Sequence, residues 1–341
     1  MHNTKSAFPG RRAFLATAAV LASIVAVPVV APNLGAAPAL AKSSVPSMVE
    51  HQARLKSVAT ADGTVRYLDL GPTDGAAIML LHGIPTSSYL YRDVAARLAE
   101  RGYRVLAPDQ LGMGASDKPS GQGIYGADRH AKRMLAVADA AGVESFVPVL
   151  HDVGGMVGWE MVMAKPDRLA GLVALNTMID LNGVRPAAMV MEIMGGQKTP
   201  DQVFGDLSDP AVARASTKQW LDQGWVDGAA PDALVDTYAK DLEGGAAAYV
   251  SFMTEAVPRF MGTGEQRVAA LEDFDKPTAI VFGTQDRYFD HTVVVPALKS
   301  ALGTPDANVT LVPEAGHFVP EHAPDKVVEA IDAFMKTLAA D

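Results

Sequence analysis

Residues 145–155 read SFVPVLHDVGG, an apolar run that ends in an acidic residue, Asp152, and two glycines. Continuous apolar runs of this length are typical of strands buried on both faces. A helix-like pattern, MVGWEMVMA, follows at 156–164. A carboxylate at the end of a core strand must be solvated, paired or chemically active, because an unpaired buried charge is costly. Asp152 therefore either caps the following helix or takes part in a reaction.

Strand-like and helix-like segments alternate on both sides of this stretch. The expected strands are 54–60, 64–70, 77–83, 103–109, 145–152, 171–178, 277–286 and 308–316, and the expected helices between them include 89–102, 128–142, 293–303 and 325–338. Such alternation predicts an α/β fold, with a mostly parallel sheet covered by helices on both faces. Residues 180–263 lose the strand pattern and predict a helical cap between two parts of a core, 42–179 and 264–341.

Two more polar residues stand where expected strands end. Asp286 closes GTQD and His317 follows the strand at 308–316. Active sites of such sheets lie at the carboxyl ends of the strands, so we expect these two side chains to lie close to Asp152. The order acid, acid, histidine matches a nucleophile on a strand–turn–helix elbow, followed by the two other members of a catalytic triad.

Five segments together carry a resemblance to a known family. They are HGIPTSSYLYRDV (82–94), APDQLGMGASDKP (107–119), HDVGG (151–155), GTQDR (283–287) and GHFVPEHAP (316–324). This set resembles the α/β-hydrolases with an aspartate nucleophile, which are the epoxide hydrolases and the haloalkane dehalogenases. The resemblance covers residues 60–178 and 270–340 and implies the α/β-hydrolase fold with a helical cap.

The resemblance implies a cofactor-free hydrolase whose nucleophile is Asp152. A carboxylate that attacks a saturated carbon leaves an ester, which water activated by His317 can hydrolyse. Asp286 would orient the imidazole and stabilise its charged form. The backbone N–H groups of Ile84 and Val153 would form the oxyanion hole. No GxSxG motif occurs in the chain, which disfavours a serine esterase.

The leaving group is open between two chemistries. Dehalogenases of this family hold the halide with side-chain N–H donors at the positions of Ile84 and Val153, and neither residue can donate from its side chain. Epoxide hydrolases protonate the ring oxygen with cap tyrosines, for which Tyr238 and Tyr249 are candidates. The sequence therefore favours epoxide opening, with haloalkane dehalogenation as the alternative. In that alternative, the indole N–H of a cap tryptophan, Trp220 or Trp225, could donate to the halide. A ligand-binding protein that keeps the fold without turnover is the alternative of another class.

The first 41 residues predict an export signal. Arg11 and Arg12 precede an apolar stretch (ATAAVLASIVAVPVV) and an A-x-A site at 39–41, and the arginine pair resembles the twin-arginine type, which exports folded proteins. The expected location is the periplasm or the exterior. A retained membrane anchor is the alternative, although the apolar run is short and contains Pro28.

Composition limits the partners. The full chain has 29 basic and 39 acidic residues, and removal of residues 1–41 takes away three basic residues and no acidic one, so the net charge changes from −10 to −13. Nucleic acid and anionic membranes need cationic surface, so neither is expected. The absence of cysteine excludes disulfides and thiolate metal sites, and the spacing of His82 and His151 fits no metal motif. The expected partners are a small apolar electrophile and water, and the oligomeric state stays open.

Overall fold

The computed structural model describes residues 46–186 and 188–339. The expected export signal, residues 1–41, lies outside this range and stays a prediction. Within the described residues, no helix combines the length and the apolar character that crossing a membrane requires.

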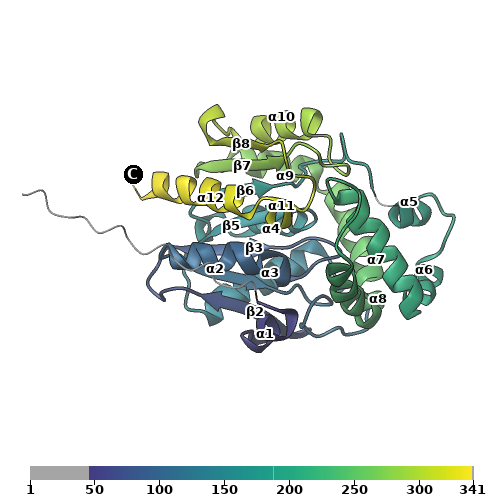
Figure 1. The fold of residues 1–341 in the computed structure, drawn as a ribbon. Helices are drawn as coiled ribbons and strands as arrows, with labels where there is room; N and C mark the ends of the chain where they lie inside the picture. The colour runs from purple at the N-terminus through teal and green to yellow at the C-terminus, as the bar shows by residue number, and fades with distance from the viewer. Residues whose placement is uncertain (1–45, 187, 340–341) are drawn as a thin grey trace, which may run out of the picture. The chain divides into compact units, whose positions relative to one another are not determined.

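A central sheet runs through the described part of the chain. Its strands are β1 (Lys56–Thr60), β2 (Gly63–Leu70), β3 (Ala77–Leu81), β4 (Arg104–Pro108), β5 (Val147–His151), β6 (Leu172–Leu175), β7 (Thr278–Gly283) and β8 (Val309–Val312). They lie in the order β1–β2–β4–β3–β5–β6–β7–β8 (Figure 1). β2 pairs antiparallel with β1 and β4, and all other pairs are parallel. The predicted mostly parallel sheet is confirmed.

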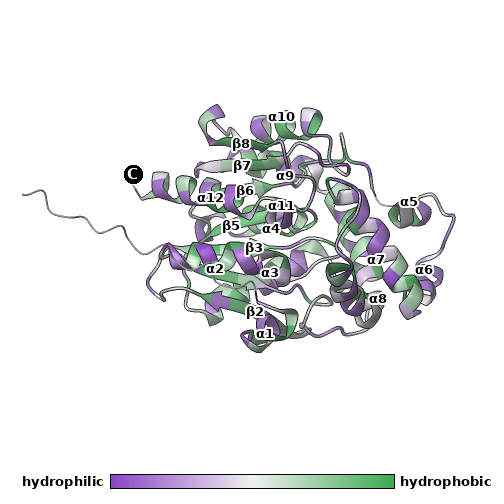
Figure 2. Cartoon of the chain, viewed as in Figure 1, coloured by the Kyte–Doolittle hydropathy of each residue, from purple (hydrophilic) through white to green (hydrophobic). Residues whose placement is uncertain are grey.

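Helices cover both faces of the sheet. One face packs against α2 (Arg92–Glu100), α11 (Val319–His322) and α12 (Pro324–Leu338), and the other against α3 (Ala127–Ala140), α4 (Gly154–Ala164), α9 (Gly264–Glu272) and α10 (His291–Leu302). Along β3, Ile78 and Leu80 join the first core and Met79 and Leu81 the second, because successive side chains of a strand point to opposite faces. This two-sided burial explains the continuous apolar runs, which colour the central strands green in Figure 2.

Four helices gather beside the sheet, where Figure 1 shows them on the right. They are α5 (Ala188–Met194), α6 (Pro200–Leu207), α7 (Pro210–Gly224) and α8 (Asp232–Gly262), all inside the segment expected to form the cap. α6, α7 and α8 share a small apolar core that includes Trp220 and Tyr249. Arg259 of α8 donates two hydrogen bonds, of 2.7 and 2.8 Å, to the buried Glu160 of α4, which ties these helices to the sheet domain.

Shorter elements complete the described chain. They are α1 (Met48–Ala53) and the single-turn helices η1 (Ser88–Tyr91), η2 (Pro166–Arg168) and η3 (Asp306–Asn308). An isolated antiparallel β-bridge pairs Val184 with Phe289 and holds the segment before α5 against the loop that follows β7. This bridge places one edge of the cap segment over the carboxyl end of the sheet.

Candidate active site

Asp152 lies on a sharp turn between β5 and α4. Its backbone has a positive φ of 52°, a left-handed conformation that few residues other than glycine adopt. Two glycines make room for the turn. A Cβ at Gly83 would overlap the Asp152 carboxylate, and one at Gly155 would overlap the hydroxyl of Thr177, which donates to the Asp152 carbonyl at 2.7 Å. The glycines in HG and HDVGG therefore let the segment after β3 approach the Asp152 carboxylate and the segment after β6 approach its backbone carbonyl.

The parallel strands bring the three predicted triad residues together. Asp152 follows β5, Asp286 follows β7 and His317 follows β8, at the same edge of the sheet. His317 Nδ1 lies 2.9 Å from Asp286 Oδ2, and His317 Nε2 lies 3.8 Å from Asp152 Oδ1. The Asp286 contact is a hydrogen bond, whereas the Asp152 contact is longer than one. The imidazole therefore binds Asp286 directly and faces Asp152 across a short gap.

A fourth strand end supports Asp286. Asn176, directly after β6, donates from Nδ2 to Asp286 Oδ2 at 2.7 Å and accepts from the backbone N–H of Gly283 at 2.8 Å. The backbone N–H groups of Tyr288 and Phe289 donate to Asp286 Oδ1 at 2.7 and 3.0 Å. Asn176 was missed in the sequence, although a polar residue at the end of the apolar run GLVAL is the same signal that identified Asp152. The buried carboxylate is thereby held in one orientation.

Burial and charge shift the pKa values of the facing pair. Burial lowers the pKa of His317, but the charge and hydrogen bond of Asp286, together with the charge of Asp152, outweigh it and raise the pKa above its ordinary value. Burial raises the pKa of Asp152, and His317 and the N–H groups of Ile84 and Val153 oppose that rise. A histidine with a raised pKa and a carboxylate partner is suited to accept a proton from water.

The two predicted oxyanion groups point at the carboxylate. The backbone N–H of Ile84 donates to Asp152 Oδ2 at 2.8 Å, and the N–H of Val153 also interacts with it. His82 fixes this loop, since its Nδ1 donates to the Gly83 carbonyl and its Nε2 accepts from the N–H of Gln110. Burial lowers the pKa of His82, so the ring is neutral, as these two bonds require. His82 therefore supports the loop.

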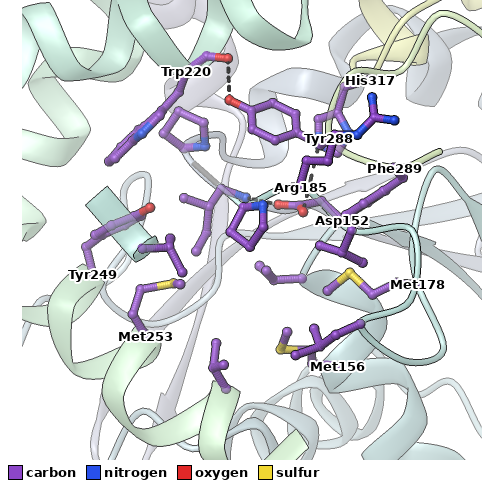
Figure 3. A pocket seen from close by; sticks show the side chains of 18 residues that line it. Asp152, Met156, Met178, Arg185, Trp220, Tyr249, Met253, Tyr288, Phe289 and His317 are labelled. Carbon is purple, nitrogen blue, oxygen red and sulfur yellow. Dashed lines mark hydrogen bonds and ion pairs between the residues drawn. The ribbon is translucent and has the colours of Figure 1, made fainter. Parts of the chain in front are cut away.

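An apolar pocket lies in front of Asp152 (Figure 3). The volume that the centre of a water molecule can occupy in this pocket is about 100 Å³. Its wall is mainly aliphatic and aromatic and includes Met156, Met178, Val257 and Phe289, and α7 and α8 supply Trp220 and Tyr249. The only charged residue of the described wall besides Asp152 and His317 is Arg185, which the sequence did not single out and whose exposed side chain pairs with Asp290. The site fits a small apolar molecule.

The structure separates the two candidate tyrosines. Tyr249 lines the pocket opposite Asp152, and its ring stacks on Trp220 with centroids 5.0 Å apart. Tyr238 lies outside the pocket wall, buried beside Tyr89 with ring centroids 6.4 Å apart. The expectation that Tyr238 faces the substrate is therefore wrong. Tyr238 lies eleven residues before Tyr249, so the two side chains project from α8 in nearly the same direction but start about 16 Å apart along the helix axis, at 1.5 Å per residue. Trp225 also lies elsewhere, against Phe318 and His322.

No group of three or more histidine, aspartate or glutamate side chains is arranged to hold a metal ion within residues 46–186 and 188–339. His151, the second histidine considered in the sequence, donates from Nε2 to the His317 carbonyl at 3.0 Å. His151 thus positions the loop that carries the imidazole.

Comparisons with known proteins agree with this geometry. A family model described as alpha/beta hydrolase fold matches residues 76–324. A haloalkane dehalogenase of Mycolicibacterium paratuberculosis is 30% identical over 279 residues, which cover 80% of this chain and 88% of the relative. Among solved structures, the epoxide hydrolase CorEH matches with a TM-score of 0.65 at 19% identity, over 83% of this chain and 99% of that one. The haloalkane dehalogenase DpaA of Paraglaciecola agarilytica matches with a TM-score of 0.61 at 24% identity, over 82% and 92%. At these identities the two solved structures share the fold.

Proposed function

Because this chain belongs to the α/β-hydrolase fold family and is a hydrolase, we propose that it opens small apolar epoxides through a covalent ester on Asp152. One observation carries the proposal. The hydroxyl of Tyr249 enters an apolar pocket opposite Asp152. The side chains beside the carboxylate, those of Ile84 and Val153, carry no N–H or O–H group that could donate a hydrogen bond.

The first step would be attack by Asp152 on an epoxide carbon. Ile84 holds Oδ2, which leaves Oδ1 as the attacking atom. An Oδ1–carbon bond forms, the carbon–oxygen bond of the ring breaks, and the Tyr249 proton passes to the ring oxygen. Burial, followed by the charge of Asp152, raises the pKa of Tyr249 well above its ordinary value, so the phenol stays protonated until an alkoxide develops. An alkoxide is far more basic than a phenolate, so the transfer is downhill.

The second step would be hydrolysis of the ester. His317 takes a proton from water, and the hydroxide attacks the Asp152 carboxyl carbon. The negative charge that forms on Oδ2 already has the N–H group of Ile84 beside it, and the N–H of Val153 stabilises charge on the same carboxyl group. Collapse of this intermediate breaks the bond between the Asp152 carboxyl carbon and Oδ1, and the leaving alkoxide takes the proton of the newly added hydroxyl, which releases a diol and restores the carboxylate. Asp286 stabilises the imidazolium in the meantime.

Haloalkane dehalogenation is the second candidate. A relative with that name is 30% identical, and a halide in the pocket could accept from the indole N–H of Trp220 and the hydroxyl of Tyr249. Both donors come from the cap, and neither stands beside the nucleophile. The same triad would hydrolyse the ester in either reaction.

The two reactions differ in their need for the tyrosine proton. We expect Tyr249→Phe to lower the rate of ester formation from an epoxide by about 10²–10⁴-fold, the range for general acids. Rapid-quench mass spectrometry measures that rate, and a parallel panel of epoxides and bromoalkanes is assayed for diol and for bromide. Tyr238→Phe is the matched control, since it removes the same atom from the same helix outside the pocket.

Unchanged epoxide turnover in Tyr249→Phe would show that this residue is not the acid. Rapid bromide release by the wild-type protein without diol formation would replace the proposal with dehalogenation.

A further inference from the structure

A second, smaller cavity lies next to the substrate pocket. The volume that the centre of a water molecule can occupy in it is about 20 Å³. Its wall includes Thr86, Met113, Asp241 and Gly245. Roughly 10–15 Å³ on this measure holds one water molecule. Tyr249 and Pro85 line both cavities, so they form the partition between them. The residue proposed to lose a proton in the substrate pocket therefore also borders a second, water-sized space.

Asp241 is an acid that the reaction described above does not use. It lies on α8, eight residues before Tyr249, or about 12 Å along the helix at 1.5 Å per residue. Side chains of a helix lean toward its N-terminus, and because the tyrosine side chain is longer than that of aspartate, the gap between their polar ends is shorter than this rise. The buried Oδ2 of Asp241 has no hydrogen-bond partner among the described residues. An acid with a free oxygen and a tyrosine thus border one small cavity.

The surroundings of Asp241 favour a protonated carboxyl near neutral pH. Burial and then the charge of Asp109 raise the pKa of Asp241 to about 7, while Lys118 and the Ser87 hydroxyl oppose the rise. Tyr238 lies within electrostatic reach as well. Both oxygens of Asp109 are occupied by backbone N–H groups, those of Ser88 and Ala115, at 2.7 and 2.8 Å. Asp241 is therefore the acid of this pair that has an oxygen free to exchange a proton.

Ring opening creates a need for such a proton. Each turnover would convert Tyr249 to a phenolate, while the proton released by water goes to His317. The substrate pocket is lined mainly by apolar side chains and offers the phenolate few donors. The phenolate must regain a proton before the next epoxide can open.

We propose that Asp241 returns a proton to Tyr249 through a water molecule in the second cavity. This inference rests on the proposed epoxide opening. The carboxyl O–H bond of Asp241 breaks, the water passes one proton on as it receives another, and the phenol O–H bond of Tyr249 forms. Asp241 then regains a proton from solvent, and His317 releases one to solvent, so each turnover adds one water to one epoxide. Asp241 acts through Tyr249 and is a relay residue.

The test compares Asp241→Asn with Asp236→Asn in the full-length protein. Asp236 is an exposed acid on the same helix, paired with Arg214 at the surface. In Asp241→Asn we expect ester formation in the first turnover at the wild-type rate, and a multiple-turnover kcat at least about tenfold lower, with the near-ultraviolet band of tyrosinate appearing in the steady state. Asp236→Asn should match the wild type, and Asp241→Glu, which keeps the acid, should restore most of the loss.

The pH profile separates proton relay from a structural role. In the wild type, kcat should fall as pH rises through about 7, because the protonated form of Asp241 is the donor. Asp241→Asn should lose this alkaline limb. An Asp241→Asn enzyme with the wild-type kcat and alkaline limb would overturn the relay while leaving epoxide opening in place, provided that Tyr249→Phe is impaired. A Tyr249→Phe enzyme that opens epoxides normally would instead remove the function on which the relay rests.

Discussion

Replacing His317 with Gln should trap the covalent ester on Asp152. His317 Nε2 lies 3.8 Å from Asp152 Oδ1, too far for a direct hydrogen bond, so we expect the imidazole to act on water in the second step. Glutamine cannot accept that proton at neutral pH. Ester formation needs only an ionised Asp152 and an acid for the leaving oxygen, so it should continue.

The size of the effect follows from the two rates. If ester formation and hydrolysis are comparable in the wild type, roughly half of the saturated enzyme is ester in the steady state. Loss of a general base slows its step by at least about 10²-fold, which raises the ester fraction to about 99%. His317 also lowers the pKa of Asp152, so its removal should shift ester formation to higher pH, and the assay belongs well above neutrality. Asp286 keeps three donors, from Asn176, Tyr288 and Phe289, so the fold should persist.

Intact-protein mass spectrometry measures the adduct, and peptide mapping locates it. Single turnover of the wild type in heavy-oxygen water should also place the label on Asp152, because the water attacks the Asp152 carboxyl carbon. The control is the thermal unfolding midpoint of the variant, which should stay close to that of the wild type. An unmodified His317→Gln protein that still turns over epoxide would refute the assignment of His317 as the base.

Two further predictions concern the triad acid and export. Asp286→Asn removes the charge that raises the pKa of His317, so the pH below which hydrolysis fails should move down. The kcat should also fall by up to about 10⁴-fold, as expected when the imidazole loses the carboxylate that orients it. An acid limb of the kcat–pH profile that stays in place would contradict this role. Replacing Arg11 and Arg12 with Lys should block export by a folded-protein route, and cell fractionation that finds the variant still exported by that route would contradict the twin-arginine assignment.

The sequence alone determined the sheet and the three residues at its edge. Core strands are buried on both faces, so their apolar runs are visible without a structure, and parallel strands bring their carboxyl ends to one side. A polar residue at the end of such a run is therefore placed near others of its kind. Asp152, Asp286 and His317 follow from this reasoning, and Asn176 would have followed if the same criterion had been applied to β6.

Only the tertiary structure decided what the cap contributes. The helical period shows which residues share one face of α8 but not which neighbour that face meets, because the crossing of α7, α8 and the sheet depends on packing between segments distant in the chain. Tyr238 and Tyr249 have the same chemistry and lie on one helix, yet only Tyr249 reaches the pocket. The second cavity beside Asp241 likewise exists only because α8 rests on the loops after β3 and β4. Local patterns place side chains within an element, and three-dimensional packing alone brings separate elements into one site.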